Sequence, residues 1–270
     1  MTMDTKLKND LISTFKKIVE MGESAGFYMD CNFLSKKEIS IRKDQMNSDI
    51  SKDNDSGVKV RLWDGDKFLE SSSSKTEEKI LFNLAQELID LGIKNNIVDK
   101  KELKIDTNNI QKEVIFEQEK LDLKETVLIL SRYNEKVKNL HESIVNARAI
   151  LLTRVEEHMF VNKHKKVFQS IPISLLAMVG FVQTPKGESK MVYESYVSRT
   201  FDENETKFKK DLPHMKQKVE AILKSKKLKG GKYKVLLHPH LTGLLAHESF
   251  GHGMEADTML KNRALASNYL

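Results

Sequence analysis

The feature that most constrains the fold is a long block of strand-like sequence. Between residues 144 and 199, apolar residues form long runs or alternate with polar ones. The most apolar stretches are residues 147–155, 167–181 and 191–197. Pro185-Lys186-Gly187 predicts a turn between the last two. Alternation of this kind is typical of an antiparallel sheet with one covered face.

Helical patterns are separated from these strands along the chain. Apolar residues recur at helical spacing in residues 7–21, 76–91, 123–142 and 202–223. Gly92 predicts the end of the second helix, and Pro213 should delay or break the fourth. Because helices and strands are segregated, we predict an α+β fold of antiparallel sheets rather than a doubly wound parallel sheet.

An earlier β-rich part precedes the second helix. Residues 27–33 and 58–62 are strand-like, with turns predicted at Asn54-Asp55-Ser56-Gly57 and Asp64-Gly65-Asp66. A further strand is predicted at residues 232–237. These patterns predict two domains, one at residues 1–110 and one at residues 111–270.

The composition bounds the class of protein. The chain has 270 residues, a net charge of +6 and a single cysteine, Cys31. It has no apolar run of 18 residues and no signal-peptide pattern at its start, so we expect a cytoplasmic protein and no membrane span. Lysine dominates the basic residues without aromatic interleaving, which argues against a nucleic-acid-binding surface. A lysine cluster at residues 224–234 is expected to be an exposed helix end and turn.

The motif that carries chemistry lies near the end of the chain. His247 and Glu248 are followed by His252, in the pattern H-E-x-x-x-H. A hydrolytic zinc site needs imidazole or anionic ligands, an open position for water and a carboxylate that takes the proton from that water. We predict His247 and His252 as zinc ligands and Glu248 as the general base.

The spacing of the two histidines predicts a distorted helix. Five residues correspond to roughly 140° on a regular α-helix, whereas a four-residue spacing gives about 40°. A single π-helical turn would restore a common face, and such turns concentrate at functional sites. Gly251 is expected to ease that distortion. Glu255 and Asp257 follow and are candidates to hold the imidazole N–H groups.

Residues 247–257 also carry a resemblance to a known family. The segment His247-Glu248-Ser249-Phe250-Gly251-His252-Gly253-Met254-Glu255-Ala256-Asp257 strongly resembles the signature of the TldD/PmbA family, the modulators of DNA gyrase. Residues 241–245 and the β-rich stretch at residues 57–65 are similar to other parts of the family. Because the H-E-x-x-x-H pattern is intact, the chain resembles the catalytic, TldD-type subunit rather than the PmbA-type partner.

The resemblance implies a cytoplasmic zinc peptidase that cleaves unfolded or extended peptides. It implies a dimer, either of like subunits or with a PmbA-type subunit. His247 and His252 would bind Zn²⁺, Glu248 would activate water, and Glu255 and Asp257 match signature positions.

The chain departs from the family pattern in its third zinc ligand. The family's ligand is a cysteine in a C-terminal domain, which we expect beyond Leu270, so the chain is expected to be a fragment with little peptidase activity alone. Cys31 lies in an apolar run and is expected in the core. His238 and His240 are weaker candidates, separated by Pro239. Two alternatives stay open: a non-catalytic binding or regulatory subunit with the same fold, and a basic nucleic-acid-binding module.

Overall fold

The computed structural model describes residues 3–264 and contains two compact units, Met1–Ser225 and Lys226–Leu270. None of the helices in residues 3–264 combines the length and the hydropathy that a membrane span requires. Each unit is treated by itself below.

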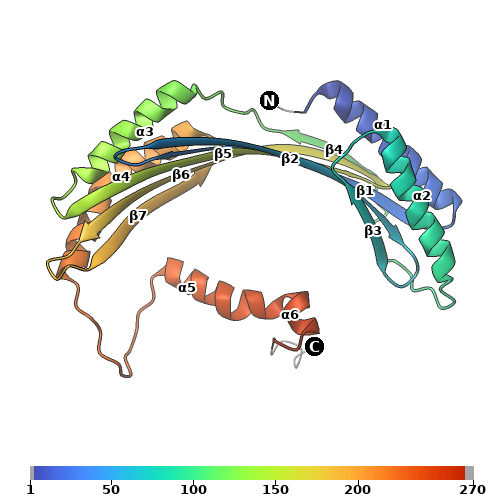
Figure 1. Ribbon diagram of the computed structural model, residues 1–270. Helices are drawn as coiled ribbons and strands as arrows, with labels where there is room; N and C mark the ends of the chain where they lie inside the picture. The colour runs from blue at the N-terminus through green and yellow to red at the C-terminus, as the bar shows by residue number, and fades with distance from the viewer. Residues whose placement is uncertain (1–2, 265–270) are drawn as a thin grey trace. The chain divides into compact units, whose positions relative to one another are not determined.

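The first unit is built on one seven-stranded sheet (Figure 1). Its helices are α1 (Thr5–Ser24), α2 (Glu78–Asn95), α3 (Leu123–Lys138) and α4 (Phe201–Lys224). Its strands are β1 (Tyr28–Lys43), β2 (Ser48–Trp63), β3 (Phe68–Ser73), β4 (Ile110–Ile115), β5 (Ile144–Val161), β6 (Lys165–Gln183) and β7 (Ser189–Ser198). The order is β3-β2-β1-β5-β6-β4, and β7 also pairs with β6. All pairings are antiparallel except that of β4 with β6. The predicted α+β class is confirmed.

Helices cover one face of this sheet at its two ends, and each end has its own core (Figure 1). At one end, Phe15 and Ile18 of α1 and Leu81 of α2 pack on β1 and β2. At the other end, Leu130 of α3 and Phe208 of α4 pack on β5, β6 and β7. The long strands connect the two cores. Successive side chains of a strand point to opposite faces, so the residues between the core positions face away from the helices.

The β1–β2 hairpin is longer than expected. The predicted turn at residues 54–57 is wrong, because β2 continues through it and Gly57 pairs with Leu34 of β1. The tip of the hairpin is instead held by Asn134 of α3. Its side-chain amide donates to the carbonyls of Ala147, at 2.7 Å, and Lys43, at 3.1 Å. The pairing of β2 with β1 along its whole length explains why residues 54–57 are strand rather than a local turn. The second predicted turn is confirmed at Gly65, which has φ of 108°.

The predicted domain boundary between residues 110 and 111 stays a prediction. The sheet itself runs across that point, because β1 pairs with β5 from Cys31↔Val161 to Lys43↔Ala149.

Two helix boundaries differ from the sequence predictions. Gly92 lies inside α2, where a Cβ would come within 3.1 Å of Leu62 and Phe27, and the helix ends at Asn96 with φ of 43°. The glycine therefore allows close packing rather than ending the helix. Helix α4 runs through Pro213 without a break. Phe208 and Met215 are both fully buried, so the two halves of α4 are anchored to the core on either side of the proline.

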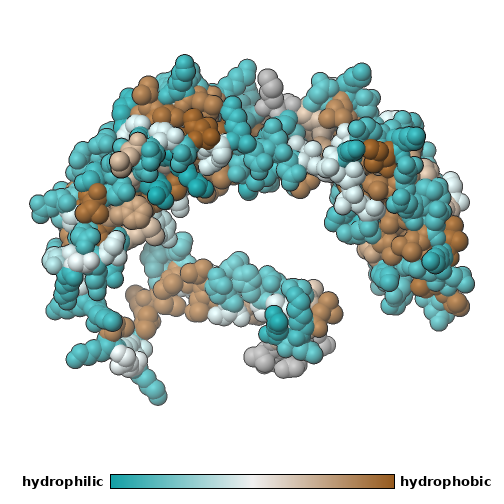
Figure 2. All heavy atoms as spheres, viewed as in Figure 1, coloured by the Kyte–Doolittle hydropathy of each residue, from teal (hydrophilic) through white to brown (hydrophobic). Residues whose placement is uncertain are grey.

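The second unit contains α5 (Pro239–Ala246), η1 (His247–Gly251), η2 (His252–Met254) and α6 (Ala256–Leu260). The strand predicted at residues 232–237 is absent, and these residues form extended coil. A strand needs a hydrogen-bonding neighbour, and no described strand pairs with this segment. Several apolar side chains of the unit are exposed, including Leu236 at 99% and Phe250 at 70%, and Figure 2 shows apolar surface along α5.

Candidate metal centre

A short helix delivers the histidine motif. Pro239 occupies the first turn of α5, where its missing N–H is not needed. The Nδ1 atom of His238 accepts from the backbone N–H of His240 at 3.3 Å and caps the helix. His238 therefore has a structural role at the start of the helix that carries the motif.

The helix changes at the first motif histidine. Residues His247–Gly251 form a π-helical turn, and the backbone N–H of His252 donates to the carbonyl of His247, five residues earlier. The predicted distortion is confirmed. Gly251 adopts φ of −57° and ψ of −57°, ordinary helical values that any residue can adopt. The prediction that Gly251 eases the distortion is therefore not supported by its backbone conformation.

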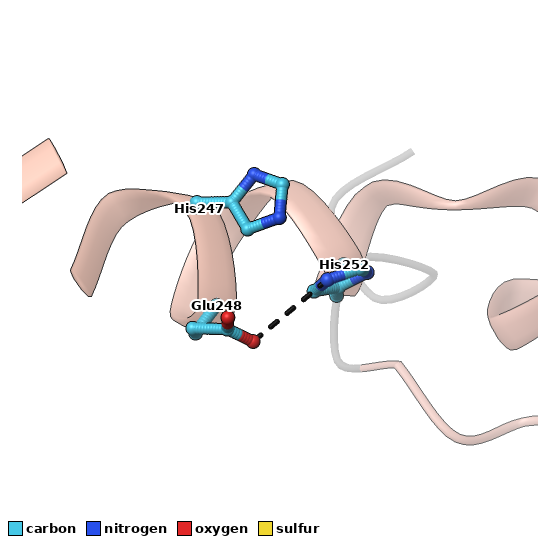
Figure 3. A group of neighbouring side chains, drawn as sticks. All are labelled: His247, Glu248 and His252. Atoms are coloured by element: carbon cyan, nitrogen blue, oxygen red, sulfur yellow. Dashed lines mark ion pairs between the residues drawn. The ribbon is translucent and has the colours of Figure 1, made fainter. Parts of the chain in front are cut away.

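The π-helical turn brings three side chains to one place (Figure 3). The imidazole rings of His247 and His252 lie 4.7 Å apart between centroids, at 76° to each other. One ligand atom from each of His247, Glu248 and His252 lies within 4.8 Å of the others. Glu248 Oε2 is 3.8 Å from His252 Nε2. All three residues are exposed, so an ion and a water molecule have access.

A second carboxylate orients one of the rings. Glu255 Oε1 lies 2.8 Å from His252 Nδ1, and this hydrogen bond raises the pKa of His252 above its ordinary value. Thr258 Oγ1 donates to the carbonyls of His252 and Glu255, at 3.1 and 2.7 Å, and ties the two residues together. Thr258 is not among the residues expected at the site, although a threonine three positions after a helix N-cap is a recognisable signal.

Asp257, the other acidic candidate, has a different contact. Its carboxylate pairs with Lys261 at 3.1 Å, within α6. Of the two candidates, Glu255 is thus the one that contacts a motif histidine.

The chemistry of the donor set fits zinc but leaves it short of ligands. Two imidazoles and a carboxylate are common donors for zinc, which takes four ligands. Within residues 3–264, His247, Glu248 and His252 are the one group of this kind. Cys31 is fully buried on β1 in the first unit, and burial raises the pKa of its thiol, so the expectation that it is a core residue is confirmed. The ligand expected beyond Leu270 lies outside the described residues.

Comparison with solved structures identifies the architecture. A protein from Bacteroides thetaiotaomicron, described as a modulator of DNA gyrase, aligns over 97% of this chain with a TM-score of 0.70 and 13% identity. A Thermotoga maritima protein with the same description aligns over 81% with a TM-score of 0.64 and 14% identity. TldE from Thermococcus kodakarensis aligns over 77% with a TM-score of 0.57 and 11% identity. The chain has the fold of the TldD/PmbA family.

The chain spans only part of these TldD/PmbA proteins. It covers 60%, 50% and 47% of the three structures in the order given. In sequence, it is 40% identical over 55 residues to a protein named a metalloprotease from Methanocaldococcus jannaschii, a match that covers 20% of this chain and 12% of that protein. The sequence matches no family model. The assignment to the TldD/PmbA family therefore rests on the structural matches and describes the fold.

Proposed function

We propose that this chain carries the zinc-binding and water-activating part of a TldD-type peptidase. The observation that carries the proposal is the π-helical turn, which places His247, Glu248 and His252 within reach of one ion. An isolated match to the motif would not require this geometry. The name of the Methanocaldococcus jannaschii relative, a metalloprotease, supports the same reading.

The three residues have distinct proposed roles. His247 and His252 hold the metal through ring nitrogens, and Glu255 fixes His252 by its Nδ1 atom so that Nε2 is the free donor. Zinc bound there would lower the pKa of a coordinated water and polarise a peptide carbonyl. Glu248 lies beside His252 and would accept a proton from a water molecule at the site as general base.

The substrate and the assembly are further parts of the proposal. The resemblance to the family favours unfolded or extended peptides as substrates, a cytoplasmic location and a dimer of like subunits or with a PmbA-type subunit. A third ligand has to come from outside the described residues, because two imidazoles and one non-ligand carboxylate do not fill a catalytic zinc site. The isolated 270-residue chain is therefore expected to cleave peptides poorly.

Metal binding by the isolated chain is the first test. We expect one zinc ion to bind weakly, because the motif supplies only two ligands, with loss of binding in His247→Ala and in His252→Ala. His240→Ala is the matched control, since His240 lies on the same helix but outside the cluster, and it should bind zinc as the unchanged chain does. Titration with a zinc indicator measures all four proteins. Equal zinc binding by the His247→Ala variant would contradict the assigned ligands.

Catalysis is tested on protein purified from its native cells with its partners still bound. We expect cleavage of an unfolded polypeptide that stops on addition of a chelator and returns with zinc. Glu248→Ala should abolish cleavage and retain zinc. A preparation that holds zinc and cleaves nothing would favour the non-catalytic binding subunit instead.

A further inference from the structure

A groove of about 850 Å³ lies on the face of the sheet that α1 and α2 leave uncovered. Asn32, Leu34 and Lys36 line the groove, and alternation along β1 fixes the face, because the Phe33 side chain between them belongs to the core beneath the helices. The groove belongs to the first unit alone. Its volume is in the range of ligand-binding sites.

The register of the strands shows how the groove is arranged. One row of paired residues crosses it from β3 to β6, in the order Ser72, Lys59, Asn32, Phe160 and Val167. The row begins with a hydroxyl and a cation and ends with two apolar side chains. Five strands at about 4.8 Å spacing span about 19 Å, the length of about six residues of extended peptide. The groove is therefore long enough for a peptide segment.

A glycine, which has no side chain, deepens the groove beside this row. The neighbouring row runs Gly57, Leu34, His158 and Gln169. Gly57 adds no side chain on β2, and Leu34 next to it is 48% exposed. A large aliphatic side chain thus lies in the floor of the groove with no cover from its β2 neighbour.

The polar end of the groove contains a guanidinium held in a fixed position. Arg61 donates from Nε and Nη2 to the two oxygens of Asp30, both at 2.8 Å. Asp30 is fully buried and also accepts from Tyr28 and Asn32. The guanidinium stacks on Phe68, 4.7 Å from the ring centroid. Its Nη1 atom donates to no described residue, so two N–H groups stay available at the groove.

The charges of the lining are unequal. Lys36, Lys59 and Arg61 line the groove, against one acidic residue, Asp55. The acidic partners of the two lysines, Glu38 and Glu70, lie outside the lining, at 2.9 and 3.0 Å from the lysine Nζ atoms. Both ion pairs are partly exposed, so their stabilisation is small and a ligand can compete for the lysines.

We propose that this groove binds an extended peptide segment with a carboxylate at one end and apolar side chains at the other. The carboxylate lies against the ammonium group of Lys59 and the Nη1 side of Arg61, because charged N–H donors are its natural partners. The apolar side chains lie against Leu34, Phe160 and Val167. The groove binds this peptide segment without help from the histidine motif, so the proposal does not depend on zinc chemistry.

Isothermal titration with a designed hexapeptide tests the groove. The probe has two leucines at one end, two glutamates at the other and a free C-terminus. A second probe replaces the glutamates with glutamines, and a third carries a C-terminal amide. The full chain is used with Glu248→Ala and a chelator, so that cleavage cannot occur. We expect saturable binding of the first probe. Binding should be at least tenfold weaker for the second probe if the groove recognises a glutamate side chain, or for the third if it recognises the C-terminal carboxylate.

Variants locate the binding. Lys59→Glu should weaken binding of the first probe at least tenfold, because Lys59 is one of the two proposed partners of the carboxylate. Lys163→Glu is the matched control, because Lys163 is exposed and ion-paired like Lys59 but lies outside this groove, and affinity should stay within about twofold. At the apolar end, Leu34→Asp should weaken binding. Ile50→Asp is its control, because Ile50 is a similarly exposed residue of β2 that lies outside the groove.

Several results would overturn the proposal. They are the absence of saturable binding, equal binding of all three probes, or equal loss in the lysine control. Zinc titration of the same lysine variants keeps the two proposals apart. Loss of peptide binding with unchanged zinc binding supports the groove, and failure of zinc binding in the unchanged chain bears only on the peptidase.

Discussion

At the residue scale, the position of His252 depends on a carboxylate outside the motif. Glu255 contacts Nδ1 at 2.8 Å, whereas Asp257, also in the signature segment, pairs with Lys261. Loss of a carboxylate that orients a histidine ligand typically weakens metal binding 10- to 100-fold. We expect Glu255→Gln to weaken zinc binding about tenfold or more and Asp257→Asn to change it little. Competition with a zinc indicator compares the two variants, and equal affinities would remove Glu255 from its orienting role.

The single thiol gives a second prediction at this scale. Cys31 is fully buried between the sheet and the helices of its core, and burial raises the pKa of its thiol. A thiol that stays protonated and covered is neither a zinc ligand nor a nucleophile. We expect no reaction with a disulfide reagent in the folded chain at pH 8 and one equivalent in denaturant. Rapid labelling of the folded protein would show that β1 opens readily.

At the element scale, close packing explains why certain glycines matter. A Cβ at Gly22 would lie 2.3 Å from Cγ and 2.9 Å from Cβ of Met29, which is buried where β1 passes α1. The Met29 Cβ cannot move without its backbone, so Gly22→Ala should lower the free energy of unfolding by about 1–3 kcal/mol. Gly230→Ala, with no atom within 4 Å of the added Cβ, is the control. Urea denaturation measures both, and equal stability would contradict the close contact.

The same scale shows what the sequence can and cannot predict. Local periodicity correctly located the four large helices and β5 to β7, because each has one apolar side that its own sequence reveals. It failed at residues 54–57, where pairing with β1 overrides the turn-forming residues. It also failed at Gly92, which lets Phe27 pack closely against α2 and does not end the helix. At residues 232–237 the alternating pattern predicted a strand, but no described strand pairs with this segment.

The candidate site was more predictable than the strands. The five-residue histidine spacing alone required an extra residue in one helical turn, and the structure has a π-helical turn there. Spacing could not tell which acidic residue contacts His252. That choice depends on where the chain leaves the helix: Glu255 is extended, with ψ of 132°, and starts α6. The groove on the sheet was invisible in the sequence, because its residues come from five strands and meet only through pairing register.

At the scale of the whole molecule, burial is distributed unevenly between the two units. Both hydrophobic cores are made of residues in the first unit, Met1–Ser225. In the second unit, the helical residues include none that is buried, and its apolar side chains are largely exposed. The stability of the fold should therefore reside in the first unit, since burial of apolar surface is the main favourable contribution to folding.

Limited proteolysis tests this division. The segment at residues 226–237 is coil with lysines at 226, 227, 229, 232 and 234, so trypsin should cut there first and leave a resistant fragment ending near Ser225. We expect that fragment to unfold within about 2 °C of the intact chain, because a difference of 1 kcal/mol in a domain of this size shifts Tm by roughly 2–4 °C. It should also lose zinc binding and keep binding of the acidic hexapeptide. A fragment that unfolds once cut would mean that the second unit contributes to the core. A fragment that folds but no longer binds the peptide would place the peptide site outside the sheet.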